Sequence, residues 1–492
     1  MITGLLASAM QVTAFEAGPL FHDFQLTLRE GRRTEALGPF LSWQQDDETV
    51  TRALHPLVSV QQWNGLERSS VDVLYPLCTY DRTGPEARWQ LLQVLSWSRG
   101  QDQSDRTTER FTLFPLLFWQ RSEDPARRSF AILPLYGHLE NRLFRDEIDV
   151  VLFPLWSRTR KREVITENWL YPLFHTRRGP GLEGWQFWPF YGREEKVPTT
   201  RTNAWDETES VPGHRKRFVL WPVYLDAHTG LGTEEPVHQR AVLPFYAETV
   251  SARQQSRSWG WPLGVTFSTN AVSGYHEVGA PWPFVVWGEG PGRSTHRFWP
   301  LYGVSTAPRQ TRQFILWPLW QERHSTTESV DRTERRVGLF VYRDVEERLV
   351  EGRRLRRALW PLAVYREDEQ GRSRLQVVAL LEPVLPGNPG VERNYSPLWS
   401  VWRMEQDPVT GRAAGSLLWN LWRWDRTPAG RKGSLLFGAV RYESDAAGLR
   451  WRVFGLPVGG RSGTGQSGTQ SVSAPGKSQP GPGARPGGGA GG

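Results

Sequence analysis

The chain has 492 residues, of which 38% are hydrophobic and 25 are tryptophan, and its formal net charge is +8. Acidic and basic residues are interspersed along it, which argues against the concentrated basic patch of a specific nucleic-acid-binding protein. The single cysteine, Cys78, excludes an internal disulfide and a thiolate zinc cluster. No apolar stretch approaches the length of a membrane-spanning helix.

The composition divides the chain into three parts. Residues 1–14 are a short apolar stretch with small residues at Ala7 and Ala9, which fits either a signal-peptide remnant or a first strand. Residues 15–458 carry an internal repeat and are predicted to form one β-repeat array. Residues 459–492 are mainly Gly, Ser, Pro and Gln, so they are predicted to be a disordered tail.

The repeat is a unit of roughly twenty residues, and about twenty-two such units fill the array. Each is centred on an apolar core with a proline, as in Trp299-Pro300-Leu301-Tyr302, followed by charged residues and a turn such as Asp445-Ala446-Ala447-Gly448. The core prolines are Pro19, Pro39, Pro56, Pro76, Pro115, Pro134, Pro154, Pro172, Pro189, Pro222, Pro244, Pro262, Pro283, Pro300, Pro318, Pro361 and Pro397. In two late units Asn420 and Gly438 replace the proline.

The residues around each core alternate between apolar and polar, which is typical of strands. Leu449, Trp451 and Val453 interleave with arginines, for example. A proline in nearly every unit would break helices, so each proline is predicted to mark a bend where the chain changes direction. The predicted fold is all-β: a tandem array of antiparallel strand and hairpin units whose Pro-centred cores pack inward with both faces buried. A barrel-like or toroidal closure and a plain meander both remain compatible with the pattern.

Two stretches depart from the regular spacing and are the places where function is expected. Residues 194–216 and residues 321–336 are polar and contain few apolar side chains. Long loops on repeat proteins often carry function, although tolerated surface insertions are the competing interpretation.

No motif in the chain indicates catalysis, a cofactor or a metal. Gly463-Thr464-Gly465-Gln466-Ser467-Gly468 matches a dinucleotide pattern, but it lies in the predicted tail with no strand before it and no helix after it. The ten histidines are scattered without the spacing of a helical metal site. Cys78 follows a core proline and is predicted to be a buried small hydrophobe. The tryptophans are predicted to fill the core; exposed rows that stack on sugars or bases are the alternative.

The units resemble a set of uncharacterised, tryptophan-rich bacterial repeat proteins with recurring LWPLY or LFPLY cores. Phe187-Trp188-Pro189-Phe190-Tyr191 and Ser416-Leu417-Leu418-Trp419-Asn420-Leu421-Trp422 carry the resemblance, which extends over most of the chain. It implies no activity. It suggests a bacterial source and an envelope location.

These observations favour a non-catalytic structural or binding protein of the bacterial cell envelope, in the periplasm or at the outer membrane, with a cytoplasmic location as the alternative. Its expected partner is an envelope protein or a glycan. Two other functions remain open: an outer-membrane β-barrel, whose dimensions the repeat number fits, and a carbohydrate-binding or carbohydrate-processing protein that uses exposed tryptophans. No catalytic, cofactor-binding or metal-binding residue is predicted.

Overall fold

The computed structural model describes residues 20–101, 107–202, 206–446 and 448–458. The predicted all-β repeat array is confirmed: one antiparallel sheet of 43 strands runs through the described part of the chain, with a separate two-stranded sheet beside it. The predicted signal-like segment 1–14 and the predicted tail 459–492, with its Gly-rich pattern, lie outside the described residues. Within the described part, no helix is both long enough and apolar enough to cross a membrane.

The strands are short, and most contain six residues. In the first half they are β1 (His22–Gln25), β2 (Gly31–Ala36), β3 (Leu41–Asp46), β4 (Thr49–Leu54), β5 (Val58–Trp63), β6 (Arg68–Val73), β7 (Cys78–Thr83), β8 (Glu86–Leu91), β9 (Leu95–Gln101), β10 (Thr107–Leu113), β11 (Leu117–Ser122), β12 (Ser129–Ile132), β13 (Tyr136–Arg142), β14 (Arg145–Val151), β15 (Trp156–Lys161), β16 (Val164–Trp169), β17 (Phe174–Gly179), β18 (Leu182–Phe187), β19 (Tyr191–Lys196), β20 (Thr199–Thr202), β21 (Thr208–Val211), β22 (Gly213–Val219) and β23 (Tyr224–Leu231). In the second half they are β24 (Val237–Val242), β25 (Tyr246–Ser251), β26 (Gln254–Trp259), β27 (Val265–Asn270), β28 (Tyr275–Gly279), β29 (Val285–Gly290), β30 (Arg293–Phe298), β31 (Tyr302–Ala307), β32 (Gln310–Ile315), β33 (Trp320–Thr326), β34 (Val330–Val337), β35 (Tyr342–Leu349), β36 (Gly352–Leu359), β37 (Ala363–Glu367), β38 (Ser373–Val377), β39 (Trp402–Asp407), β40 (Arg412–Leu417), β41 (Trp422–Thr427), β42 (Gly430–Leu435), β43 (Val440–Asp445), β44 (Gly448–Val453) and β45 (Leu456–Val458). The helical segments are η2 (Pro125–Arg127), α2 (Pro389–Asn394) and α3 (Ser396–Trp399).

The core prolines from Pro39 to Pro361 lie in turns along one long edge of the sheet, so the predicted change of chain direction is confirmed for them, whereas Pro19 lies outside the described residues. Fifteen X–Pro peptide bonds among the described residues are cis, and a cis proline is the defining third residue of a type VI turn. In the turn between β32 and β33, the Leu319 amide donates to the Leu316 carbonyl at 2.7 Å across Trp317 and Pro318. The proline therefore stands outside the strand ladder, where its missing N–H removes no interstrand bond.

Apart from a shift between Gly213 and His214 in the β22–β23 pair, the register between strands is constant along the described sheet. A single row of directly opposite residues runs from His22 in β1 to Pro457 in β45 without a stagger. Closing a sheet into a barrel requires a stagger between strands. In keeping with this, β1 pairs only with β2 and β45 only with β44 in the described part, and the sheet is not closed into a barrel.

The two faces of the sheet differ in burial. We call the face that carries this row the inner face. It also carries the residues two positions away from the row in each strand. The opposite face is the outer face. Most buried strand residues lie on the inner face, among them Ser59, Ala131, Leu139 and Val286. Side chains on the concave side of a curved sheet converge, and those on the convex side spread apart, which explains the difference.

The prediction that the aromatic cores are buried on both faces is wrong. Fifteen tryptophans among the described residues are more than a third exposed, including Trp185, Trp287 and Trp317. A single-layer sheet has no second layer to cover its outer face, so most of these side chains pack against their lateral neighbours, although Trp360 and Trp419 also donate to carbonyls of the helical insertion. Trp299 and Trp317, for example, stand before successive turn prolines with ring centroids 5.7 Å apart. Cys78, also predicted to be buried, is only partly covered.

The irregular stretches also need correction. Residues 321–336 are not a loop, because they belong to β33 and β34, which pair regularly in the sheet. Within residues 194–216, the chain leaves the large sheet to form the β20–β21 hairpin and then returns. The largest interruption, which the sequence did not predict, is residues 378–401. There α2 and α3 replace a proline turn, and Pro397 lies in α3.

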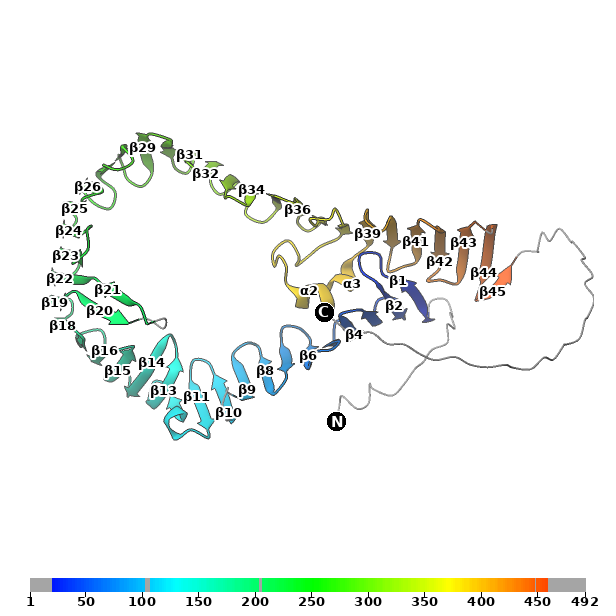
Figure 1. Cartoon of the computed structure of the whole chain (residues 1–492), viewed down its shortest axis with the longest axis horizontal. Coiled ribbons are helices and arrows are strands. Elements are labelled where there is room, and N and C mark those ends of the chain that lie inside the picture. Colours follow the sequence, from blue (N-terminus) through cyan, green and yellow to red (C-terminus); the bar gives the residue numbers. More distant parts are fainter. Residues whose placement is uncertain (1–19, 102–106, 203–205, 447, 459–492) are drawn as a thin grey trace, which may run out of the picture.

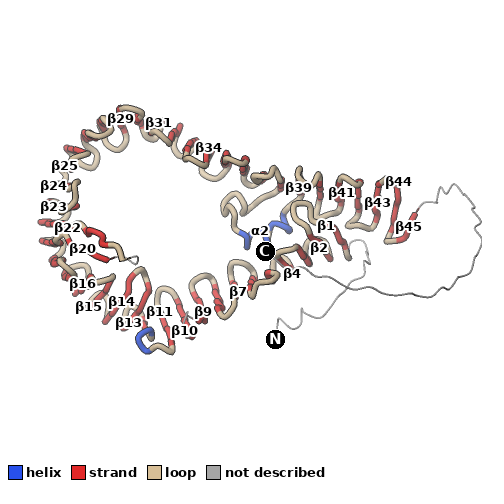
Figure 2. Tube along the Cα trace, viewed as in Figure 1, coloured by secondary structure: helices blue, strands red, loops and turns tan. Residues whose placement is uncertain are grey.

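The strip of strands curves round until its two ends overlap, forming a ring (Figure 1). Near the overlap the inner face of β1–β7 faces the inner face of β36–β42, and α2 and α3 lie between them (Figure 2). The ends meet through side chains rather than through strand pairing: Asn420 donates to Glu35 at 2.5 Å, and Ser434 contacts His22 at 3.3 Å.

Candidate functional site

The helical insertion fastens the two walls of the overlap to each other. Asn388 caps α2 by accepting from the Val391 amide at 3.1 Å, and Pro389 occupies the first turn. From this helix, Arg393 and Asn394 donate to one carboxylate oxygen of Asp72 in β6, at 2.5 and 2.7 Å. Asp72 is 2% exposed and Asn394 is 1% exposed. This contact is therefore a buried, charge-assisted lock between segments far apart in the sequence.

Beside the lock, the overlap forms a partly open cavity of about 700 Å³. Its walls come from the inner faces of β2–β5 and β36–β39 and from the helical insertion. Nine arginines and five carboxylates line it. The arginines are Arg29, Arg33, Arg354, Arg356, Arg366, Arg372, Arg374, Arg393 and Arg403, and the carboxylates are Asp46, Glu367, Asp368, Glu392 and Glu405. Arginines outnumber carboxylates in the lining itself, and four of them pair with carboxylates just outside it: Arg33 with Glu35, Arg354 with Glu347, Arg372 with Asp407 and Arg393 with Asp72.

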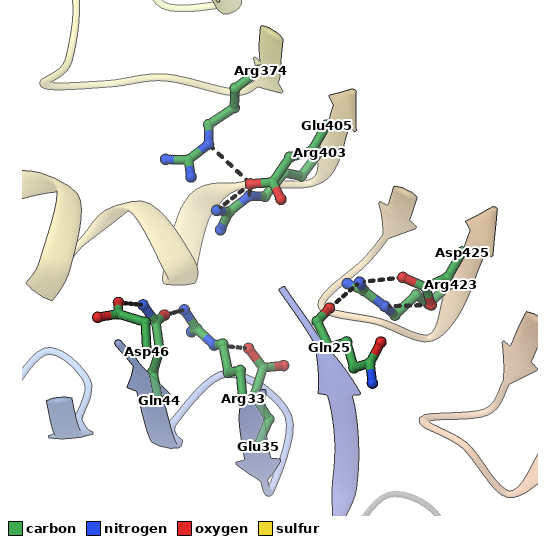
Figure 3. Close-up of polar contacts among 10 residues, drawn as sticks. All are labelled: Gln25, Arg33, Glu35, Gln44, Asp46, Arg374, Arg403, Glu405, Arg423 and Asp425. Atoms are coloured by element: carbon green, nitrogen blue, oxygen red, sulfur yellow. Dashed lines mark hydrogen bonds and ion pairs between the residues drawn. The ribbon is translucent and has the colours of Figure 1, made fainter. Parts of the chain in front are cut away.

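At the centre of one wall, two arginines share a single carboxylate. Arg374 in β38 and Arg403 in β39 lie 2.9 and 2.6 Å from the same oxygen of Glu405 (Figure 3). Burial alone would raise the pKa of Glu405, but the two guanidinium groups outweigh it and hold that pKa at about 2. Repulsion by Arg403, with burial, lowers the pKa of Arg374 to about 10. Burial would lower the pKa of Arg403, but Glu405 outweighs it and raises that pKa, so Arg374 is the less well compensated cation of the two.

Arg356 adds a further cation to the same wall. Its guanidinium donates to a backbone carbonyl, that of Glu382, at 2.8 Å. Burial, followed by repulsion from Arg366 and Arg343, lowers the pKa of Arg356 to about 10. An anion in the cavity would offset both the burial of these cations and their mutual repulsion, because it would replace the interactions with water that they lose on burial.

The opposite wall contributes Arg33 in β2. Its Nε lies 2.8 Å from Glu35, and a terminal nitrogen donates to Gln44 at 3.4 Å. Burial lowers the pKa of Arg33 although Glu35 opposes the shift. In Figure 3, Arg33 and Gln44 from this wall and Arg374 and Arg403 from the other lie on opposite sides of the same space. The cavity therefore offers planar, bidentate donors from two directions, the arrangement suited to carboxylates and phosphates.

The cavity lining also contains a Ser–His pair, which does not form a strong nucleophile. Ser42 Oγ lies 2.8 Å from His55 Nε2. Burial, with repulsion from Arg33, lowers the pKa of His55 to about 4. An imidazole with so low a pKa is neutral at pH 7 but is a weak base, so it activates the hydroxyl poorly.

A second cavity, of about 790 Å³, lies on the inner face far from the overlap. Trp188, Trp221 and Trp261, each before a turn proline, line it together with Phe218. Trp188 and Trp221 have ring centroids 5.9 Å apart, and Trp221 is 49% exposed.

Polar groups converge on the floor of this second cavity. Glu194 lies 2.6 Å from both Arg177 and His214. Burial would raise the pKa of Glu194, but Arg177 and His214 outweigh it and lower that pKa. Burial, with Arg177, lowers the pKa of His175 beside them.

The two stretches singled out in the sequence contribute unequally to these cavities. Residues 321–336 line neither of them, and 194–216 supplies only Glu194 and Lys216 to the second. Sequence reasoning missed the arginine cavity. The available signal was a set of arginines spaced two apart or directly opposite on consecutive strands: Arg354 and Arg356, then Arg366 and Arg374. Comparison with protein-family models and with curated proteins gives no match for this chain.

Proposed function

We propose that the chain is a non-catalytic binding protein of the bacterial cell envelope and that the arginine cavity takes a small polyanion. The observation that supports this proposal is the convergence of nine arginines from both walls on one partly open cavity of about 700 Å³, a size typical of small-molecule sites. Phosphate and carboxylate groups are the chemistry that bidentate guanidinium donors recognise. The envelope location rests on the resemblance of the repeats.

The test compares the affinity of two small polyanions for matched variants. Inorganic pyrophosphate and citrate are titrated into the full chain by calorimetry at constant ionic strength. We expect Arg374→Gln to weaken binding at least tenfold, because it removes a partly desolvated donor whose loss costs upwards of about 2 kcal/mol. Arg312→Gln, an exposed arginine of the inner face outside the cavity, should bind as the wild type does.

Two outcomes would contradict this proposal. One is a wild-type protein that binds neither anion more tightly than it binds chloride. The other is equal loss of binding in Arg374→Gln and Arg312→Gln, which would indicate diffuse attraction to the whole basic chain. A preference between pyrophosphate and citrate would identify the ligand's charged group.

The second cavity favours a second function, the binding of a glycan. Sugar rings present C–H groups that pack on aromatic faces and hydroxyls that need hydrogen-bond partners. Trp188, Trp221 and Trp261 supply such faces, and Gln186 and Gln239 supply amides in the same lining.

For this second function, Trp221→Ala is expected to abolish the change in tryptophan fluorescence that a cello- or chito-oligosaccharide causes on titration. The matched control is Trp287→Ala, which removes an indole that is 61% exposed on the outer face and should leave the titration unchanged. An unresponsive wild-type protein, or equal responses in the two variants, would count against glycan binding.

A further inference from the structure

A second kind of site lies on the outer face, at the pair of strands β23 and β24. His228 and His238 are directly opposite each other in the ladder. Their imidazole rings are stacked, with centroids 3.9 Å apart and planes 11° from parallel. Asp226 is two residues before His228 on the same strand face, and its Oδ1 lies 2.9 Å from His238 Nε2. One ligand atom from each of the three residues lies within 4.8 Å of the others.

We infer that Asp226, His228 and His238 bind a divalent transition-metal ion such as Zn²⁺. Two imidazole nitrogens and one carboxylate oxygen suit Zn²⁺, Cu²⁺ or Ni²⁺ better than Mg²⁺ or Ca²⁺, which prefer oxygen ligands alone. Three protein ligands leave a coordination position open to water or to a fourth ligand. All three side chains are partly exposed, so the ion reaches them from solvent.

The strand ladder holds the three ligands in place before any ion arrives. Their backbones belong to a regular antiparallel pair, in which directly opposite residues have neighbouring Cβ atoms and residues two apart share a face. Only a few side-chain torsions then have to be fixed for the three ligand atoms to converge on one ion, which keeps the entropic cost of binding low.

The described residues contain another cluster, His138 with Glu147 and Asp149, and it is the weaker candidate. It offers one imidazole instead of two, and Glu147 is already paired with Arg160 at 2.8 Å. The cation nearest to Asp226, Arg217, lies 3.6 Å away, so its ion pair is looser. Because the carboxylate of the His138 cluster is the more tightly paired of the two, His138 is a matched control position for the metal titration.

The experiment is a calorimetric titration of the full chain, without an affinity tag, with Zn²⁺. We expect one site that is weakened at least tenfold in His228→Ala and in His238→Ala. His138→Ala and His276→Ala, the latter an exposed outer-face histidine on β28, should bind as the wild type does. Because the two ligand histidines are partly exposed side chains of the outer face, their loss leaves the fold intact, which circular dichroism checks.

A second readout uses Co²⁺ in place of Zn²⁺. Co²⁺ held by His228 and His238 in a four-coordinate site gives a visible absorption band that the hydrated ion lacks, and this band should be missing in both ligand variants. No saturable Zn²⁺ binding by the wild type, or a loss of binding only in His138→Ala, would overturn the assignment. Neither result bears on the arginine cavity, which shares no residue with this site.

Discussion

Replacing Asp72 by alanine is expected to open the ring. The carboxylate accepts hydrogen bonds from Arg393 and Asn394 on α2 and lies in an almost fully buried position. Its removal leaves the Arg393 guanidinium, which is 14% exposed, without its carboxylate partner. Breaking a buried ion pair from one side costs about 3–5 kcal/mol. Asp72→Ala therefore weakens the contact between α2 and β6, and no backbone pairing holds these two elements together.

Small-angle scattering of the full chain measures the effect as an increase in the radius of gyration. Asp81→Ala is the control, because Asp81 is exposed on the inner face of the neighbouring strand β7. The local hairpins should survive in both variants, since each pairs only with its neighbours, and the far-ultraviolet circular dichroism should be unchanged. An Asp72→Ala protein with the wild-type radius would show that the other contacts of the overlap suffice.

The strand pattern and the turn positions could be predicted from the sequence because they depend on local rules. Alternating residues such as those around Trp451 specify a strand with two different faces. A proline in each core indicates a change of direction, since it supplies no N–H to a ladder. The recurrence of the units then indicates one long array of antiparallel strands.

The burial of the aromatic residues could not be predicted correctly, because it depends on the number of layers. Trp299 or Trp317 in a two-layer fold would be covered by the opposite sheet. In one curved layer they have neighbours only along the turn edge. Periodicity in the sequence shows which residues share a face but does not show what covers that face.

The arginine cavity depends on contacts between residues hundreds of positions apart. Asp72 and Arg393 carry no local sign that they will meet. The helical insertion did have a local sign: Asn388 followed by Pro389 is a typical helix start. Assigning Pro397 to another repeat core concealed it.

Replacing Glu405 by glutamine is expected to lower the stability of the ring and raise its affinity for anions. The pKa of Glu405 is about 2 in the folded protein and 4.5 ordinarily. A depressed pKa of this kind contributes stability above pH 4.5 that is lost as the pH falls toward 2. At pH 7 the variant should therefore be less stable by about 3 kcal/mol, and the difference from the wild type should shrink between pH 4.5 and 2.

Thermal unfolding at several pH values measures the first effect. Glu328→Gln serves as the control because that side chain is 91% exposed in a turn and contributes little. A stability difference between the wild type and Glu405→Gln that stayed constant down to pH 2 would contradict the assigned pKa.

The anion affinity of Glu405→Gln is expected to rise although its stability falls. In the wild type, Glu405 is the anion that Arg374 and Arg403 already hold, so it competes with any ligand for them. Its neutral replacement frees both guanidinium groups and removes one negative charge from the cavity. An interaction of this size at a partly buried site is worth roughly tenfold or more in affinity. Pyrophosphate should therefore bind more tightly and raise the unfolding temperature of Glu405→Gln by more than that of the wild type. A general loss of structure would weaken stability and binding together, and only an anion site centred on these two arginines would move them in opposite directions.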